Sequence, residues 1–347
     1  MSAQVVCVGE SMITLLPEQP GPLEDAELFR RGFGGAESNA ACALVALGVP
    51  AAWVSRVGAD GFGRLLLDGI ASHGVDVSGV DIDPHRPTGL YVKEIGAATG
   101  SPHDLGPGRS KLHYYRSTSA GSVLEPATLD QPRVAALLDS ARLIHLTGIT
   151  AALGQASGRD GGRQLVQAVL DQRRPGQLVS FDVNWRPAMW QRPEGSGGVD
   201  PADVLATLAD QADVVFVGGD EAQALFGTDD PERLRALLPG PRLLVVKDAE
   251  NGVSAFEGDT VVVEPALRVE VVEPIGAGDS FAAGYLAGLL RGYEQRRRLR
   301  LGHICAACAL MVSGDHGTPP AADELTRLLE CTAQEWSKLR AAAEVIA

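Results

Sequence analysis

Short β-branched runs alternate along the chain with longer segments in which apolar residues recur at helical spacing. The runs predict strands at residues 4–8, 51–57, 142–146, 177–183, 213–217 and 242–247. The intervening segments predict helices at residues 36–47, 62–73, 159–172, 200–209 and 220–226. Because strands and helices alternate, we expect an α/β fold with a doubly wound, mostly parallel sheet that helices flank on both faces.

The alternation is interrupted once near the N-terminus and changes character near the C-terminus. Residues 89–95 and 111–116 look like strands, and the Gly/Pro/Ser-rich stretch 96–110 between them predicts a mobile loop. We expect one domain over residues 1–347, with a small β-sheet lid formed by about 15–33 and 87–118. Toward the C-terminus the pattern predicts a hairpin at 253–263 and three helices, at residues 278–290, 294–312 and 321–340.

Composition narrows the class of protein. The chain has 347 residues, of which 45% are hydrophobic and 21% charged, and this is ordinary for a globular protein with a full core. Its net charge of −14 disfavours nucleic acid and anionic membranes as partners. No run approaches the roughly 18 apolar residues of a membrane span, and the first residues lack a signal-peptide pattern. We therefore expect a cytoplasmic protein.

The cysteines and an isolated histidine carry little chemistry. Five cysteines without a spaced framework argue against a disulfide scaffold. Cys305 and Cys308 form a C-x-x-C pair, but it lies in an apolar helical run with no second pair to complete a zinc site. His145 lies on an apolar strand. We interpret all three as core packing.

The segment GAGDSF at residues 276–281 is the most informative part of the chain. Gly276 and Gly278 let the backbone turn sharply, so that N–H groups, including that of Ala277, can point to one spot at a helix start. This is an anion-binding arrangement, and a carboxylate inside it suits a base that deprotonates a hydroxyl attacking phosphorus. Asp279 is therefore the candidate base. The alternative is that Asp279 only caps the helix.

A second glycine-rich helix start reads GGAESN at residues 34–39. Gly34 and Gly35 permit close approach of a ligand, and the amide of Asn39 can both donate to and accept from sugar hydroxyls. Since glycine-rich helix starts are common, this segment alone is as compatible with a simple turn as with a binding loop.

Together the two segments, with VGADGFG at residues 57–63 between them, resemble the ribokinase-like (PfkB) carbohydrate kinases. The resemblance spans nearly the whole chain. It implies a β-sheet lid over the sugar, and ATP with Mg²⁺ as cofactors, often with a monovalent cation nearby. It implies a phosphoryl group held by residues 276–279. Because lid sheets in this family often pair between subunits, it also makes a homo-oligomer through the lid sheet plausible.

Within that family, several stretches are similar to the 2-keto-3-deoxygluconate kinases: GGAESN at 34–39, GLY at 89–91, YYRSTSAGS at 114–122, LTGIT at 146–150, DVNWRP at 182–187 and GDHG at 314–317. By resemblance, the residues that contact the sugar acid are Gly34, Tyr91, Tyr114, Arg116, Ile149 and Arg186. Arg116 and Arg186 each offer a planar fork suited to a carboxylate, and Arg186 could equally face the phosphates.

On the nucleotide side, the resemblance implies contacts from Asn184, Arg186, Lys247, Asn251, Gly252, Gly276, Gly278 and Asp315. The sequence departs from the family pattern at three places. Ala249 replaces a glycine of the usual turn. Gly218 replaces an asparagine, so that Glu221 alone carries over as a group near hydrated Mg²⁺. Glu273-Pro274 replaces Asp-Thr, which leaves activation by a monovalent cation open.

The leading hypothesis is a kinase that phosphorylates the terminal hydroxyl of 2-keto-3-deoxygluconate. A neutral sugar such as fructose or ribose is the first alternative. A sugar-binding regulator that has lost catalysis is the second, motivated by the departures at Gly218, Ala249 and Pro274. The sequence does not distinguish the gluconate from the galactonate epimer.

Overall fold

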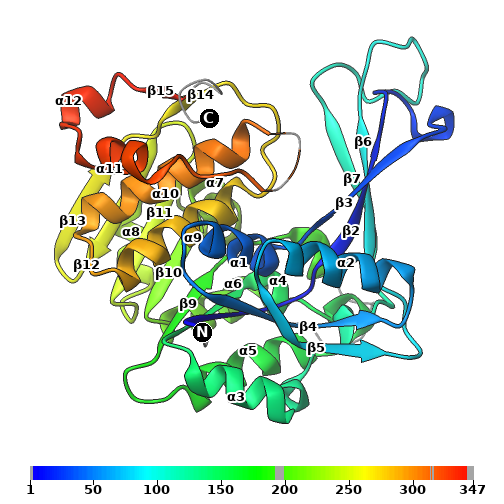
Figure 1. Ribbon diagram of the computed structural model, residues 1–347, viewed down its shortest axis with the longest axis horizontal. Helices are drawn as coiled ribbons and strands as arrows, with labels where there is room; N and C mark the ends of the chain where they lie inside the picture. Colours follow the sequence, from blue (N-terminus) through cyan, green and yellow to red (C-terminus); the bar gives the residue numbers. More distant parts are fainter. Residues whose placement is uncertain (1–2, 192–198, 313, 315, 342–347) are drawn as a thin grey trace.

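The computed structural model describes residues 3–191, 199–312, 314 and 316–341 (Figure 1). Its main feature is a nine-stranded sheet in the order β13-β12-β11-β10-β9-β8-β1-β4-β5. The strands are β1 (Val5–Val8), β4 (Ala51–Gly58), β5 (Asp76–Asp83), β8 (Leu143–Thr147), β9 (Leu178–Asp182), β10 (Val214–Gly218), β11 (Leu243–Asp248), β12 (Gly252–Glu257) and β13 (Thr260–Glu264). In this order, all neighbouring strands from β11 to β5 pair in parallel, and β12 and β13 add antiparallel strands at the other edge.

Helices cover both faces of this sheet because alternate strand residues are apolar on both sides. In β10, Val214 and Phe216 join one core cluster while Val215 and Val217 join the other. The first cluster is covered by α1 (Ala36–Ala46), α2 (Gly61–Ser72), α9 (Ala277–Leu290), α10 (Gln295–Leu310) and α11 (Ala322–Glu330). The second is covered by α3 (Pro132–Ser140), α5 (Gly161–Gln172), α6 (Pro201–Asp210), α7 (Gly219–Phe226) and α8 (Pro231–Leu237). The expected doubly wound α/β architecture is confirmed.

A separate four-stranded sheet projects from the body of the molecule (Figure 1). We call it the small sheet: β3 (Phe29–Gly34), β2 (Met12–Pro17), β6 (Leu90–Ile95) and β7 (Ser110–Tyr115), in that order. Both segments expected to form a lid therefore contribute strands to one sheet. Between β6 and β7, the carboxylate of Asp104 accepts hydrogen bonds from the backbone N–H groups of Ala97, Thr99 and Gly106, so this loop folds back on itself.

Strand order places a ligand crevice at one point of the main sheet. β1 lies between β4 and β8, and the chain winds outward in opposite directions from there. At such a switch point, the loops after neighbouring strands separate and leave a crevice at the carboxyl ends of the strands. β1 leads directly into Gly9 and Glu10 and then into β2 of the small sheet. The crevice and the small sheet are therefore adjacent by connectivity.

Two expectations about secondary structure are wrong. The interruption after the second helix contains β5, an edge strand that its aspartates and Gly79 kept from looking like a strand. Gly79 is buried, and a Cβ there would lie 2.9 Å from side-chain atoms of Leu137 and Val54. The buried carboxylate of Asp83 accepts from the backbone of the following turn. The helix expected at 321–340 is two helices, α11 and α12 (Ala333–Trp336). Thr332 begins α12 through a capping box with Glu335, and this T-x-x-E spacing was the available sequence signal.

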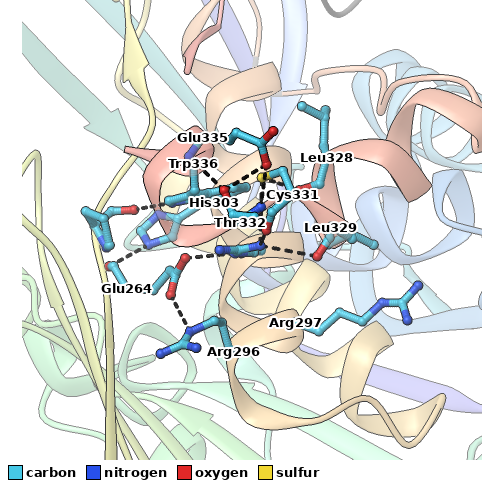
Figure 2. A network of polar contacts seen from close by, with 12 residues as sticks. Glu264, Arg296, Arg297, His303, Leu328, Leu329, Cys331, Thr332, Glu335 and Trp336 are labelled. Carbon is cyan, nitrogen blue, oxygen red and sulfur yellow. Dashed lines mark hydrogen bonds and ion pairs between the residues drawn. The ribbon is translucent and has the colours of Figure 1, made fainter. Parts of the chain in front are cut away.

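A polar network ties the edge of the main sheet to the C-terminal helices (Figure 2). The buried carboxylate of Glu264, at the end of β13, accepts from Arg300 Nε at 2.8 Å and from Arg296 Nε at 3.0 Å. Its backbone carbonyl accepts from His303 Nε2 at 3.2 Å, and burial lowers the pKa of His303 to about 4, so the ring is neutral. Arg300 also donates to the carbonyl of Cys331 after α11. The network therefore fixes β13, α10 and α11 to one another.

Candidate active site

A cavity of about 550 Å³ lies where the small sheet meets the carboxyl ends of the main strands. It is lined by most of the residues singled out from the sequence: Gly34, Gly35, Asn39, Tyr91, Tyr114, Arg116, Ile149, Asn184, Arg186, Glu221, Lys247, Gly276, Gly278 and Asp279. These residues come from both sheets and from the starts of α1, α7 and α9. The structure therefore brings together, at one site, segments that are more than 240 residues apart in the chain.

The two glycine-rich segments begin helices at this cavity for different local reasons. Gly276 has a φ of +81°, a left-handed conformation that a residue with a side chain rarely adopts, and α9 begins immediately after it. Gly35 needs no special conformation, but a Cβ there would lie 2.5 Å from the carbonyl oxygen of Glu10. Glycine is thus required for the turn at 276 and for close packing at 35.

Asp279 lies in the first turn of α9, with its half-buried side chain at the cavity. Its Oδ2 accepts a hydrogen bond from Asn39 Nδ2 at 3.0 Å, which joins the two helix starts. Burial raises the pKa of Asp279 to about 8, and the charge of Asp182 adds to the rise, while Asn39 and the nearby cations oppose it. A carboxyl in a cleft with a pKa near neutral pH is suited to accept a proton once it is deprotonated.

Two ion pairs line the side of the cavity formed by the main strands. Lys247, at the end of β11, donates from Nζ to Asp182 Oδ2 at 2.7 Å. Arg186 donates from Nη1 to Glu221 Oε1 at 2.7 Å. Burial alone lowers the pKa of Lys247, but the carboxylates of Asp182 and Glu221 outweigh it and the net pKa is raised. Lys247 therefore stays charged. Together with Arg186, it places two cations in the part of the cavity next to the start of α9.

The part of the cavity next to the small sheet carries a third ion pair, which sequence reasoning missed. Arg116 contacts the carboxylate of Glu10 through Nε at 2.8 Å and Nη2 at 2.5 Å, and Glu10 is 2% exposed. Ser119 donates to the other oxygen of Glu10. The rings of Tyr91 and Tyr114 lie 5.6 Å apart beside this pair. The sequence signal for Glu10 was its position two residues after the end of β1.

Only some of the remaining residues that were expected on the nucleotide side lie at the cavity. Asn184 is buried at the cavity in a left-handed conformation with a φ of +33°. At the β11–β12 turn, Asn251 is exposed and Gly252 is buried, and neither residue lines the cavity. A Cβ at Gly252 would lie 2.5 Å from the carbonyl oxygen of Glu264, which accounts for glycine there. Asp315 lies outside the described residues.

Ala249, the residue that replaces a family glycine, adopts a φ of +38° in the same turn. A left-handed conformation costs a residue with a Cβ roughly 1–2 kcal/mol, which the greater flexibility of glycine when unfolded offsets in part. We therefore expect Ala249→Gly to raise the free energy of unfolding by about 0.5–1 kcal/mol in urea denaturation.

The matched control for Ala249→Gly is Gly258→Ala in the next turn of the same meander, where φ is +59° and no atom lies within 4 Å of the added Cβ. That change should lower stability by about 1 kcal/mol. Equal effects of one sign from both variants would contradict the assignment of strain to Ala249.

Two other kinds of site are absent from the described part of the chain. No three histidine, cysteine or carboxylate side chains there converge in a way that would hold a metal ion on their own. No helix there has the length and apolar character that crossing a membrane requires. Cys305, Cys308 and His145 are buried, and His145 Nδ1 is hydrogen-bonded to Ser180 Oγ at 2.8 Å. Their interpretation as core residues is confirmed.

Comparison with known proteins agrees with this arrangement. The family model of the pfkB family carbohydrate kinases matches residues 2–322. A 2-dehydro-3-deoxygluconokinase of Thermoproteus tenax is 34% identical over 330 residues, covering 94% of each chain. A 2-dehydro-3-deoxygluconokinase of Bacillus subtilis is 33% identical over 333 residues, covering 95% of this chain and 96% of the other.

A crystal structure of a PfkB protein from Polaromonas has a TM-score of 0.72 to this chain at 31% identity, covering 97% of this chain and all of the other. The match in sequence and in fold thus extends over nearly the full length, including both glycine-rich helix starts. The chain belongs to the pfkB family of carbohydrate kinases.

Proposed function

We propose that this kinase transfers the γ-phosphoryl group of MgATP to the terminal hydroxyl of 2-keto-3-deoxygluconate, the compound also called 2-dehydro-3-deoxygluconate. The observation that carries the proposal is the position of Asp279. Its carboxyl lies at the start of α9 in the cavity that Arg116, Arg186 and Lys247 also line, and the charges of Lys247 and Arg186 act on it. The names of the two curated relatives support the choice of sugar acid.

In the proposed reaction, Asp279 takes the proton of the terminal hydroxyl as its oxygen attacks the γ-phosphorus. The bond from that phosphorus to the bridging oxygen breaks, and ADP leaves. The N–H groups of Ala277 and Gly278 at the start of α9 stabilise charge on the transferred group, because they are fixed and point out of the helix. Arg116 binds the sugar carboxylate, while Lys247 and Arg186 balance the charge of the phosphates.

Magnesium fits the donor set around the phosphate half of the cavity. Mg²⁺ is usually held by one or two carboxylates together with water and substrate phosphates, and Glu221 and Asp182 supply carboxylates here. When bound, it would neutralise part of the triphosphate charge. A monovalent cation stays a prediction. The carboxylate of Glu273, which stands where the family has an aspartate, contacts Lys93 as Asp182 contacts Lys247 and Glu221 contacts Arg186.

A neutral sugar is the second candidate, and one observation favours it. Glu10 balances the charge of Arg116 within the site, so the sugar side of the cavity has less net positive charge than Arg116 alone would give. The Nη1 atom of Arg116, which is directed to Met189 Sδ at 3.3 Å, is the part of its fork that does not contact Glu10.

A coupled assay for ADP release decides between these candidates when 2-keto-3-deoxygluconate, its galactonate epimer, fructose and ribose are compared side by side. We expect the largest kcat/KM for 2-keto-3-deoxygluconate, with the phosphate on the terminal oxygen in phosphorus NMR of the product. A larger kcat/KM for fructose or ribose would replace the sugar-acid proposal with the neutral-sugar candidate.

The pH dependence of the reaction follows from the raised pKa of Asp279. The base must be deprotonated to act, so kcat/KM should rise with pH and level off above an apparent pKa of about 8. The measurement is kcat/KM over a pH series at constant ionic strength with the best sugar of the panel. A flat profile from about pH 6 to pH 9 would show that no such base limits the reaction.

Two further parts of the sequence-based picture stay predictions: that the small sheet acts as a lid, and that copies of the chain associate through it. The small sheet carries exposed apolar side chains, with Phe29 39% and Tyr115 63% exposed, and Leu28 next to β3 is 66% exposed. Sedimentation of the purified protein measures the association state directly.

A further inference from the structure

A buried ion pair joins the small sheet to the segment that precedes α9. Lys93 lies on β6, and its Nζ contacts Glu273 Oε2. Both residues are 7% exposed. Because side chains alternate along a strand, Lys93 is on the same face of β6 as Tyr91, which lines the cavity, and its partner in β7, Leu112, also lines it. Lys93 itself does not line the cavity.

Glu273 uses its two carboxylate oxygens for different purposes. Oε2 takes the ammonium of Lys93, while Oε1 accepts the backbone N–H of Ile275 at 3.3 Å. The backbone N–H of Glu273 donates to the carbonyl of Leu310 at the end of α10 at 3.2 Å, which anchors the residue. Ile275 is followed at once by Gly276 and the start of α9. One carboxylate thus connects a strand of the small sheet to the backbone that leads into the anion-binding turn.

We propose that Lys93 and Glu273 are positioning residues that couple the placement of the small sheet to the conformation of residues 275–278. When the small sheet covers the cavity, the ammonium of Lys93 fixes the carboxylate of Glu273, and that carboxylate fixes the N–H of Ile275. When the small sheet moves away, Glu273 loses its cation and the backbone next to Gly276 loses its support. The importance of this backbone for transfer rests on the proposed function, but the coupling itself does not.

The physical reason for the coupling is the cost of an unpaired buried charge. Two buried charges are tolerated only while they balance each other. Separating this pair would therefore either expose both groups to water or leave them buried without a partner. The ion pair therefore favours one position of the small sheet relative to the turn before α9. Lys111, on β7 of the same sheet, is an exposed lysine and provides a matched control.

The test is hydrogen exchange read by mass spectrometry on the full chain, without substrate, in two reciprocal variants. Lys93→Met should make the amides of residues 275–278 exchange about tenfold faster, although the change is in the small sheet. Glu273→Gln keeps a side-chain carbonyl oxygen that can accept from Ile275 and removes the charge. It should make β6 and β7 exchange about tenfold faster. Lys111→Met should change neither region.

Exchange in β10, in the core of the main sheet, serves as the internal reference for global opening. The proposal is overturned if Lys93→Met changes exchange only in the small sheet and Glu273→Gln only near residue 273. It is also overturned if Glu273→Gln leaves the exchange rates of β6 and β7 as in the unaltered protein. Should Lys93→Met fail to fold, Glu273→Gln decides alone, because it replaces one carboxylate oxygen by an amide group and keeps the size of the side chain. These readouts need no sugar, so their failure is separate from any failure of the proposed substrate.

A turnover measurement shows whether the coupling matters for the reaction. With the best sugar of the panel, Lys93→Met should lower kcat by about tenfold with a smaller change in KM, because neither residue lines the cavity. Lys93→Arg keeps a cation and should restore most of that loss. If Lys93→Arg behaved like Lys93→Met, the role of the charge would be contradicted.

Discussion

Asp279→Asn should lower kcat by about 10²–10⁴-fold while leaving the binding of sugar and nucleotide largely intact. The side chain keeps its size and can still bond to Asn39, but it can no longer accept the proton of the attacking hydroxyl. The substitution should cost little stability because the site already disfavours a charged carboxyl, as the raised pKa of Asp279 shows. Steady-state kinetics gives kcat, and titration calorimetry with MgADP gives the affinity.

Asp220→Asn is the control for this change. Asp220 is also an aspartate in the first turn of a helix, α7, but it is exposed and does not line the cavity. Its variant should retain normal turnover. If Asp279→Asn kept near-normal kcat, Asp279 would be a helix cap and the assignment of the base would be wrong.

Arg116→Ala has the second largest expected effect, a loss of about 10²–10³-fold in kcat/KM for the sugar acid. The guanidinium is held by Glu10 through Nε and Nη2, so its orientation is fixed and Nη1, which lies 3.3 Å from Met189 Sδ, is the group left to meet the carboxylate of the sugar. Neutral sugars lack that carboxylate and should lose far less. The measurement is the ratio of kcat/KM for 2-keto-3-deoxygluconate to that for fructose, in the variant and in the unaltered protein.

Arg109→Ala, which removes an exposed arginine in the loop between β6 and β7, should leave this ratio unchanged. A general disturbance of the site, caused by leaving Glu10 buried without its cation, would lower kcat/KM for all sugars alike. Equal losses for acid and neutral sugars would therefore count against Arg116 as the carboxylate ligand.

The features that sequence reasoning predicted are those with a local physical cause. The glycines at 276 and 278 followed by Asp279 indicate a helix start with a carboxylate because left-handed turns and helix ends have their own residue preferences. The buried parallel strands were predictable because a strand covered on both faces must be continuously apolar, as β10 is.

The features that sequence reasoning missed depend on contacts between distant residues. Glu10 with Arg116, Asp182 with Lys247 and Lys93 with Glu273 are pairs separated by 106, 65 and 180 positions, and nothing near either partner indicates the other. Likewise β5 is polar because it lies at the edge of the sheet, a position that only the assembled fold defines.

Whether Asp279 lies within reach of both the sugar hydroxyl and the end of the nucleotide can be seen in a crystal structure of the Asp279→Asn variant with 2-keto-3-deoxygluconate and MgATP, which that variant should hold unreacted. The terminal hydroxyl oxygen should lie about 2.6–3.2 Å from the side chain at position 279 and in line with the γ-phosphorus. A sugar bound with that hydroxyl directed away from position 279, or a nucleotide whose last phosphate lies far from the start of α9, would contradict the role of Asp279.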